Sequence, residues 1–507
     1  MSTAIDTLNK QFPDMNKYES FGGATRDNPY LADPVQKHQR KICDSIEDAI
    51  KRSGLRDGMT ISFHHAFREG DKLINLVVGI IAKMGFKNMT LASSSLLSCN
   101  EPLIEHIKSG VITNIYTSGM RGKLADALSH GLMKNPVHIH SHGGRVKLIQ
   151  KGEIKIDVAF LGVSSADEFG NANGVSGKSR CGALGYAMVD AQYAKTVVLL
   201  AEEIVEYPNV HPASIRQDQV DYIVKVDEVG DPTKISLGAV RLTSNPRELM
   251  IARHAADVIE HSGYFKNGFS IQTGSGASAT ACTRFMEGRM RRDNIVAKFA
   301  LGGITASIVE LHEKGLVETL LDTQSFDAAA ALSLAKNPRH VEISTNFYAN
   351  PGSKAASVDE LDIVILSALE IDLDFNVNVL TGSDGVMRGA SGGHCDAAAG
   401  ANLTIITAPL IRSRIPTVVK KVTTKITPGE SVDVLVTDHG IAVNPARPEV
   451  AERLKAAGMP VMTIQELYER AISLTGEPQP IEFTDRVVGV VHYRDSSVID
   501  LVYQVKD

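Results

Sequence analysis

The apolar and polar residues of this chain repeat with two alternating periods. The short apolar run Met59–His64 has the length of a strand, and Asp71–Phe86 carries apolar residues at helical spacing before another short apolar run, Asn88–Ser93. This order predicts a strand–helix–strand unit. The rhythm continues through further short apolar runs, namely VITNIY, VHIHSH, IDVAFLGV, TVVLLAE and DYIVKV. Because these runs carry few polar positions, we expect a mostly parallel sheet with both faces covered.

The same order of segments starts again near Asn245. Segments of the second half echo segments of the first at three pairs of positions: Gly54 and Gly263, Asp157 and Asp362, and Asp221 and Asp433. The members of these pairs are 209, 205 and 212 positions apart, and such regular intervals are hard to obtain by chance. A pattern that recurs in this way predicts two related domains in tandem.

The composition of the connecting segments indicates where these domains begin and end. Gly, Pro, Ser and Asn gather in VGDPTKISLGAVRLTSNPRE, so we place the boundary near Gly238. Beyond Arg470 two apolar runs, RVVGVVHYRD and SVIDLVYQV, predict a β-hairpin added to the second domain. The predicted division is a mostly polar arm (1–40), a first α/β domain (41–237), a second α/β domain (238–470) and a hairpin extension (471–507).

Length and composition exclude several classes of protein. A chain of 507 residues with 43% hydrophobic and 22% charged residues has the size and balance of two globular domains, and not of a disordered chain. No apolar stretch is long enough to span a bilayer and no secretory signal is visible, so we expect a cytoplasmic location. The formal net charge of -6 gives no general attraction to nucleic acid or to an anionic membrane.

The cysteines and the clustered histidines do not indicate a disulfide framework or a metal site. The five cysteines are scattered and include no CxxC pair, so we expect reduced thiols. Cys395 stands beside a histidine, which allows a thiolate nucleophile, although a buried structural cysteine is the commoner case. His138, His140 and His142 would share one face of a strand, but no carboxylate or HExxH pattern accompanies them, and we expect no metal.

Two glycine-rich turns are candidate ligand contacts. In GASGGHCD, Gly389, Gly392 and Gly393 would let backbone N–H groups approach a ligand closely, and an ordinary turn before a helix is an equally good interpretation. Gly274 and Gly276 follow an apparent strand, as the glycines of a dinucleotide-binding turn would. The next strand, AKFALGG, ends in glycines instead of the acidic residue that would bind a ribose, so a dinucleotide is not expected.

His64, His65 and Arg68 come where the first predicted strand gives way to its helix. Substrates of open α/β sheets bind beyond the carboxyl ends of the strands, so these side chains are candidates for substrate contact. An arginine can hold a carboxylate through two parallel hydrogen bonds, although an exposed arginine paired with a neighbouring acid is the more frequent arrangement.

Several of these segments together resemble known enzymes. Two α/β halves with glycine-rich turns at strand ends, and the turn that carries Asp167, Gly170 and Asn171, are similar to the coenzyme A transferases. Within that superfamily, the resemblance is to the α chains of citrate lyases, through SFHHAFREGD, HSHGGRVKL, DEFGNANG, NVNVLTGSDGVMRGASGGHCD and TDHGIAVNPARPE. The fold that this resemblance implies is two tandem related coenzyme A transferase-like α/β domains with mostly parallel sheets, plus a C-terminal β-hairpin extension.

The resemblance implies an acyl transferase that exchanges acetate for citrate on the thioester of an acyl carrier protein. The thiol would belong to the carrier's phosphoribosyl-dephospho-coenzyme A group, so the chain itself is expected to bind no cofactor. A separate β chain would cleave the citryl thioester to oxaloacetate and the acetyl thioester, and the carrier would be the γ chain. We therefore expect an oligomer within a multisubunit complex that serves citrate fermentation.

The resemblance also assigns roles to individual residues. Glu370 follows the predicted strand LDIVIL, where related transferases place a carboxylate that takes the acyl group as a mixed anhydride, although citrate could instead attack directly. Gly392 and Gly393 would supply N–H donors to the oxygen that becomes charged. The other expected contacts are His64, His65, Arg68 and Asn378 for the acceptor substrate, and Gly274, Gly276, Gly302, Gly303 and Gly389 for the thioester or its pantetheine arm.

Two other functions stay open at this point. A coenzyme A transferase or thioesterase that acts on free acyl-coenzyme A would use the same site, and a ligand sensor would use the same fold without catalysis. Sensors usually append a DNA-binding helix pair, and the polar arm shows no such pattern. For docking of an acidic carrier, Arg289, Arg291 and Arg292 form the densest arginine cluster of the second half, although a basic helix end that complements its own dipole is the commoner explanation.

Overall fold

The computed structural model describes residues 4–14, 41–209, 212–235 and 243–506. The chain divides into two compact units, residues 1–41 and 42–507. The first unit contains the short helix α1 (Ala4–Gln11), and the rest of the predicted arm lies mostly outside the described residues, as does the domain boundary predicted near Gly238. Within the described ranges, no helix has the length and apolar character needed to cross a membrane.

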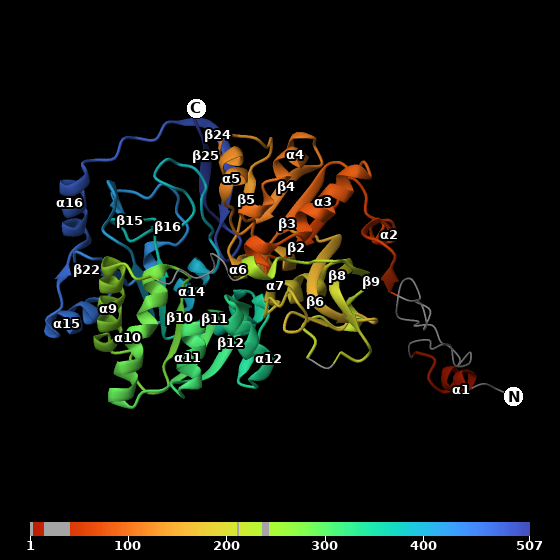
Figure 1. Ribbon diagram of the computed structural model, residues 1–507, viewed down its shortest axis with the longest axis horizontal. Helices are drawn as coiled ribbons and strands as arrows, with labels where there is room; N and C mark the ends of the chain where they lie inside the picture. Colours follow the sequence, from red (N-terminus) through yellow and green to blue (C-terminus); the bar gives the residue numbers. More distant parts are fainter. Residues whose placement is uncertain (1–3, 15–40, 210–211, 236–242, 507) are drawn as a thin grey trace. The chain divides into compact units, whose positions relative to one another are not determined.

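The first half of the larger unit is a parallel sheet with helices on it, as its alternating pattern predicted (Figure 1). Its strands follow the order β1-β9-β8-β6-β2-β3-β4-β5. The strands are β1 (Ile42–Cys43), β2 (Thr60–Phe63), β3 (Met89–Ser93), β4 (Ile112–Thr117), β5 (Val137–Ile139), β6 (Val158–Asp167), β8 (Thr196–Val205) and β9 (Tyr222–Lys225). The helices are α2 (Ile46–Arg52), α3 (Leu73–Lys83), α4 (Leu103–Lys108), α5 (Gly122–Ser129), α6 (His142–Gln150), α7 (Gly185–Tyr193) and α8 (Pro232–Ile235).

The second half builds another sheet, in the order β13-β12-β11-β10-β14-β17-β21-β22-β23. All neighbours are parallel except β21 and β22. The strands are β10 (Ser270–Thr273), β11 (Ala297–Ile304), β12 (Val317–Ser325), β13 (His340–Glu342), β14 (Ile363–Ser367), β17 (Leu403–Thr407), β21 (Val434–Val436), β22 (Ile441–Val443) and β23 (Val461–Met462). The helices are α9 (Pro246–His261), α10 (Ala277–Asp293), α11 (Ala306–Glu313), α12 (Ala328–Lys336), α13 (Thr345–Ala349), α14 (His394–Gly400), α15 (Pro448–Ala456) and α16 (Ile464–Thr475).

The two sheets share one topology, which is the structural form of the repeat seen in the sequence. The order β9-β8-β6-β2-β3-β4-β5 of the first sheet corresponds strand by strand to β21-β17-β14-β10-β11-β12-β13 of the second. The repeated aspartates have equivalent tasks: Asp157 and Asp362 accept the N–H groups of Thr60 and Ser270 (both 2.9 Å), and Asp221 and Asp433 accept those of Val197 (2.8 Å) and Thr404 (2.7 Å). Each carboxylate therefore ties the start of one strand to the strand beside it.

The C-terminal hairpin forms as predicted, but its predicted place in the second domain is wrong. Strand β24 (Phe483–His492) pairs antiparallel with β25 (Val498–Val505) and parallel with β5 of the first sheet (Figure 1). Val488, Val491 and Val502 belong to the first hydrophobic core. Without the hairpin, β5 would be an edge strand with unpaired backbone N–H and C=O groups. Strand β24 forms hydrogen bonds with these groups. The hairpin also begins later than residue 471, because α16 continues to Thr475.

A small sheet beyond the carboxyl end of β14 carries the main candidate catalytic residue. It consists of β15 (Glu370–Asp372), flanked by β16 (Val377–Asn378) and β20 (Val418–Val419). A two-stranded ribbon of β18 (Ile411–Arg412) and β19 (Ile415–Pro416) precedes β20. In the first half, the corresponding feature is β7 (Ala172–Asn173), which pairs antiparallel with the end of β6.

Candidate functional site

Glu370 is a buried carboxylate held by hydrogen bonds to both of its oxygens. Its Oε2 accepts from the backbone N–H of Thr423 and from Asn378 Nδ2, both at 2.8 Å, and its Oε1 accepts from Thr423 Oγ1 at 3.0 Å. Asn378 lies directly opposite Glu370 in the antiparallel pair of β15 and β16. Three donors from two residues therefore fix the orientation of the carboxylate. Asn378 contacts Glu370, and its predicted contact with the substrate stays a prediction.

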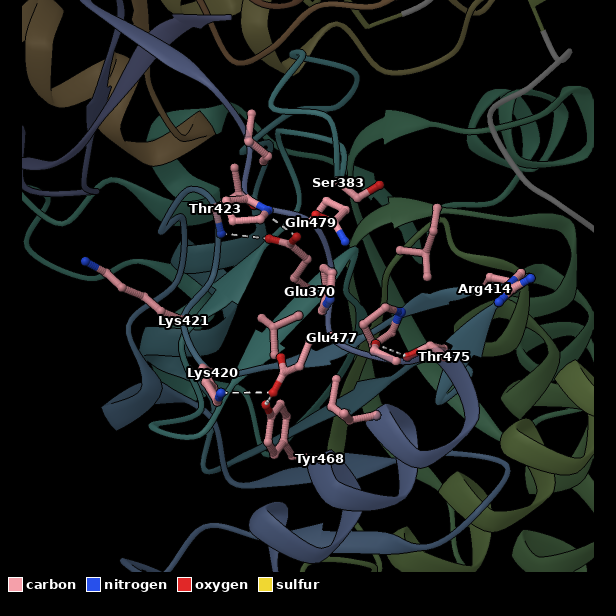
Figure 2. A pocket seen from close by; sticks show the side chains of 18 residues that line it. Glu370, Ser383, Arg414, Lys420, Lys421, Thr423, Tyr468, Thr475, Glu477 and Gln479 are labelled. Atoms are coloured by element: carbon pink, nitrogen blue, oxygen red, sulfur yellow. Dashed lines mark hydrogen bonds and ion pairs between the residues drawn. The ribbon is translucent and has the colours of Figure 1, made fainter.

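Glu370 borders a cavity of about 590 Å³ between the small sheet, the ribbon β18–β19 and helix α16 (Figure 2). One wall is the segment 476–481, which runs from the end of α16 towards β24. Glu477 on this segment pairs with Lys420 (2.9 Å) and accepts from the hydroxyl of Tyr468 (2.6 Å). The apolar lining consists of Ile415, Pro416, Val419, Ile472, Pro478, Pro480 and Ile481.

The internal repeat allows Glu370 to be compared with the equivalent residue of the first half, which is not a carboxylate. Asp167 and Asp372 hold matching turns, each accepting N–H groups from the residues that follow it. In these matching turns, Ser165 pairs with Asn173 as Glu370 pairs with Asn378. The first half therefore offers a serine hydroxyl where the second offers a carboxylate. The two halves share a scaffold but differ in chemistry.

The glycine-rich segment 389–393 runs between the two halves. Ser391 N–H donates to Ser118 O (2.8 Å), and Gly392 O accepts from His142 N–H (2.8 Å). Gly392 has φ +54, a conformation that favours glycine. Within the described part of the chain, no backbone carbonyl accepts a hydrogen bond from the N–H group of Gly392 or Gly393. These two donors, predicted from sequence, are therefore free to bind a ligand.

His64, His65 and Arg68 lie together after β2, but they face different neighbours. His64 Nε2 bonds to Gly162 O at 2.8 Å, and burial lowers the pKa of His64 to about 4. The ring is thus committed to the fold. His65 bonds through Nδ1 to Ser94 Oγ (2.5 Å) and packs against the rings of Tyr186 and His142, with centroids 4.9 and 6.0 Å away.

Arg68 is a half-buried cation that forms no ion pair with a carboxylate among the residues that the structure describes. Its guanidinium lies 4.3 Å over the ring of Phe326 and donates weakly to Ser325 O (3.4 Å), both in the second half. Its Nε has no hydrogen-bond partner, and its backbone has the left-handed φ of +52. Burial lowers the pKa of Arg68 to about 10. A partly desolvated guanidinium that forms no direct ion pair is suited to bind an anion.

Most of the glycines predicted to contact the thioester or its pantetheine arm are required by packing within the protein. A methyl group on Gly302, which has φ +96, would lie 2.9 Å from the side chain of Gln272. On Gly276 and Gly303 it would overlap Ser367 and the ring of Phe326. Gly274 has ordinary space, and Gly389 lies tightly against the Val379 carbonyl. Their predicted contact with the pantetheine arm stays a prediction.

Several polar residues of the site were not predicted from the sequence. Thr423 lies 53 positions from Glu370 in a stretch without a motif. Gln272, the largest polar residue of the buried strand FSIQT, donates to Tyr348 Oη at 2.8 Å, and its Oε1 is unpartnered. A polar side chain inside an otherwise buried strand was a signal that could have been used. Tyr186 had no such signal.

The predicted residues form two groups that the turn 389–394 connects. Glu370 and Thr423 line the cavity, with Asn378 behind Glu370, whereas His65 and Arg68 lie at the contact between the two halves. His394 Nε2 bonds to Ser367 O (3.0 Å), three positions before Glu370. In the same turn, Gly392 O accepts from His142 N–H, and the ring of His142 packs against His65 and Tyr186.

The alternative catalytic groups are satisfied elsewhere. Burial raises the pKa of Cys395 to about 12, which disfavours a thiolate. His138 Nδ1 contacts His492 Nε2 (2.9 Å), and no group of three metal-ligand side chains occurs in the described part of the chain. The arginine cluster of α10 is ion-paired: Arg289 with Asp257 and Glu260, Arg291 with Glu287, and Arg292 with Glu260 and Asp293. This favours the structural explanation for these arginines.

Comparison with known proteins identifies close relatives over the whole length. The family model described as "Citrate lyase, alpha subunit (CitF)" matches residues 39–505. The citrate lyase alpha chains of Klebsiella pneumoniae and Escherichia coli are 68% and 69% identical, over 100% and 92% of both chains respectively. The solved structure of a putative citrate lyase α subunit from Streptococcus mutans, in complex with citrate, is 52% identical, covers 99% of both chains and superposes with a TM-score of 0.92.

Proposed function

The chain belongs to the citrate lyase α subunit family, the citrate CoA-transferase component of that enzyme, and from this premise we propose that acetate is exchanged for citrate at Glu370. The acetyl donor is an acyl carrier protein, whose phosphoribosyl-dephospho-coenzyme A group supplies a thiol that carries acetate as a thioester. The chain binds no cofactor of its own. Within a cytoplasmic complex, the β chain cleaves the citryl thioester to oxaloacetate and the acetyl thioester.

The observation that carries the proposal is the placement of Glu370. Its carboxylate borders a cavity and is oriented by Thr423 and Asn378. An oriented carboxylate can attack the acetyl carbonyl, form an anhydride with acetate and release the thiolate, which splits one difficult exchange into easier steps. The free N–H groups of Gly392 and Gly393 are suited to stabilise the oxygen that becomes negative during attack.

Citrate is proposed to bind at the contact between the two halves. Arg68 offers a half-buried guanidinium with an unpartnered Nε, and His65, three positions earlier, packs against Tyr186. A carboxylate of the trianion would supply the missing counter-charge and two hydrogen bonds. The citrate complex of the Streptococcus relative supports a citrate site in this family. His64 is left out of this role, because its ring is bonded to Gly162.

The exchange itself is tested with acetyl-carrier protein and citrate, followed by mass spectrometry. The wild-type chain should form citryl-carrier protein and free acetate. Glu370→Gln should lower the rate by about a thousandfold, because it removes a group that acts in the transition state. Ser165→Ala is the matched control, since Ser165 occupies the equivalent position of the first half, and it should retain the wild-type rate. A Glu370→Gln chain with the wild-type rate would end the proposal.

Isotope labelling separates the covalent route from direct attack by citrate. In a single turnover with ¹⁸O-carboxyl citrate, the covalent route releases acetate that carries an oxygen from Glu370, so the acetate is unlabelled and the label enters Glu370. Direct attack releases ¹⁸O-acetate instead. We expect unlabelled acetate in the first turnover, and labelled acetate at that stage would contradict a nucleophilic Glu370.

A further inference from the structure

We infer that the cavity at Glu370 receives the phosphorylated pantetheine arm of the carrier protein, and that Arg414 and Lys421 at its rim bind the phosphates. The inference rests on the proposed function, because it names the path by which the thioester reaches Glu370. It concerns a surface formed by β18, β19, the residues after β20, and the segment 476–481.

The shape and lining of the cavity match a slender, uncharged chain. Its volume of about 590 Å³ falls within the range of sites that enclose small ligands. Apolar side chains from the ribbon, from α16 and from the segment 476–481 line it on several sides. Ile415 of β19 is 44% exposed, so this wall of the cavity presents an uncovered apolar side chain. An alkyl arm with amide groups would cover this surface, and its acyl end would meet the carboxylate of Glu370.

The charges at the rim are not neutralised by the protein. Lys420 is paired with Glu477, whereas Arg414 and Lys421 are exposed and have no carboxylate partner in the described ranges. Figure 2 shows these two residues on opposite sides of the cavity, with Glu370 between them. Two free cations on either side of an apolar opening attract a ligand whose far end carries phosphates.

The arginine cluster of α10 gives a useful contrast. Arg291 and Arg292 are also exposed, but each is bonded to a neighbouring acid. An anion that docks there would have to compete with those acids, whereas at Arg414 it would not. The free charges therefore lie at the cavity, and the predicted docking cluster of α10 is the less suitable surface.

The wall formed by residues 476–481 gives the rim a defined shape. Proline at 478 and 480 restricts the backbone of this segment, and its start is held by the contacts of Glu477 with Lys420 and Tyr468. Its far end continues into β24, which is fixed in the first sheet. An opening bounded by an anchored segment is already formed before the ligand arrives, which lowers the entropic cost of binding.

The test compares three acetyl donors on the double variant Arg414→Gln/Lys421→Gln. Acetyl-carrier protein carries the phosphates on a protein, acetyl-coenzyme A carries them free, and acetyl-pantetheine has none. For the carrier, KM should rise about tenfold or more, kcat should be retained, and the decrease in affinity with added salt should become shallower. With acetyl-pantetheine, KM should not change. Arg291→Gln/Arg292→Gln is the control and should behave as wild type with all three donors.

Each outcome is decisive. An unchanged KM for acetyl-carrier protein would overturn the inference, as would a change confined to acetyl-coenzyme A, because the cavity would then serve the free thioester. A higher KM for acetyl-pantetheine would show that the cations do not act through phosphate. Affinity of fluorescently labelled carrier for Glu370→Gln chains, with and without the rim substitutions, gives the same comparison without catalysis. A wild-type chain that binds carrier but does not exchange acyl groups would refute the proposed function alone.

Discussion

Gly393 lies against the hydroxyl of Tyr348, and this contact provides two possible reasons for a glycine there. Its φ of −95 is accessible to any residue, so the backbone does not require glycine. A methyl group would lie 2.6 Å from Tyr348 Oη, and it would also stand beside the free N–H. Packing and catalysis therefore both disfavour a larger residue at this position.

Combining two substitutions separates these reasons. Gly393→Ala should reduce exchange by about a hundredfold or more, if its N–H binds the charged oxygen. Adding Tyr348→Phe removes the clashing hydroxyl, so the melting temperature should return to that of Tyr348→Phe alone while the rate stays low. Thermal unfolding and exchange rates measured on all three variants check this. A rate that recovers together with the stability would mean that Gly393 is needed for packing only.

At the residue scale, the sequence located candidate side chains better than it predicted their orientation. The end of the first predicted strand is where Arg68 and His65 lie, as expected from the rule that ligands bind beyond strand ends. Whether a side chain turns to a ligand or to the fold depends on neighbours far away in sequence. Gly162 takes the ring of His64, and Thr423 takes the carboxylate of Glu370. No local pattern encodes either contact.

The repeated aspartates give a test at the level of strands. Asp157 accepts the N–H of Thr60, and Asp362 accepts both the N–H and the hydroxyl of Ser270. Alanine at either position leaves a strand N–H without its partner, which costs about 1 to 3 kcal/mol. We expect both variants to unfold at lower urea concentration than wild type, with Asp362→Ala the more affected.

A matched control is Glu318→Ala, which changes an exposed acid on β12. It should unfold close to the wild-type midpoint. If Asp157→Ala behaves like this control while Asp362→Ala does not, the two halves are equivalent in topology but not in how their strands are stabilised.

Element prediction succeeded where periodicity was long and failed where pairing was decided at a distance. The long strands and helices follow from the apolar runs, and the hairpin follows from two such runs near the C-terminus. Periodicity shows that β24 needs a partner but not which edge provides one, so its place beside β5 was missed. The small sheet at Glu370 has strands of two or three residues, too short for any periodic signal.

Buried histidines make the whole molecule sensitive to acid. Burial lowers the pKa of His64, His138 and His394 to about 4 and that of His142 to about 3, and it holds the pKa of His65 and of His140 well below the usual range. In the unfolded chain, histidine titrates near its ordinary value of about 6.5. Below that pH, the unfolded chain takes up protons that the folded chain refuses, so stability falls as the pH decreases towards 4.

Five acids act in the opposite sense. Burial raises the pKa of Asp71 to about 7 and that of Asp396 to about 6, and it also raises those of Asp190, Glu342 and Asp433, so the folded state binds their protons first. They offset only part of the histidine effect, because the histidines outnumber them. We expect the urea midpoint to fall continuously from pH 7 to pH 4.5. In His138→Gln, the decrease of the unfolding free energy with pH should be shallower, by up to about 1.4 kcal/mol per pH unit. A midpoint that is level or rising towards acid would contradict this.

At the scale of the whole chain, the repeat was sufficient to predict two related sheets, and the residue boundaries between them stay a prediction. The motifs of GASGGHCD and LDIVIL were recognisable because they are contiguous. The cavity at Glu370 was not, since its walls come from separate segments spread between residues 370 and 481. A site whose residues are far apart in the sequence can be recognised only once the three-dimensional structure is known.

The hairpin at β5 has a consequence for synthesis on the ribosome. Strands β1 to β9 emerge first, the whole second sheet follows, and β24 and β25 are made only after both sheets. Nascent domains normally fold in the order in which they emerge. Here the first domain keeps an open edge at β5 until the second sheet has been made, and an open edge can pair with another chain. Chains that stop between the second sheet and β24 are therefore the ones most exposed to misassembly.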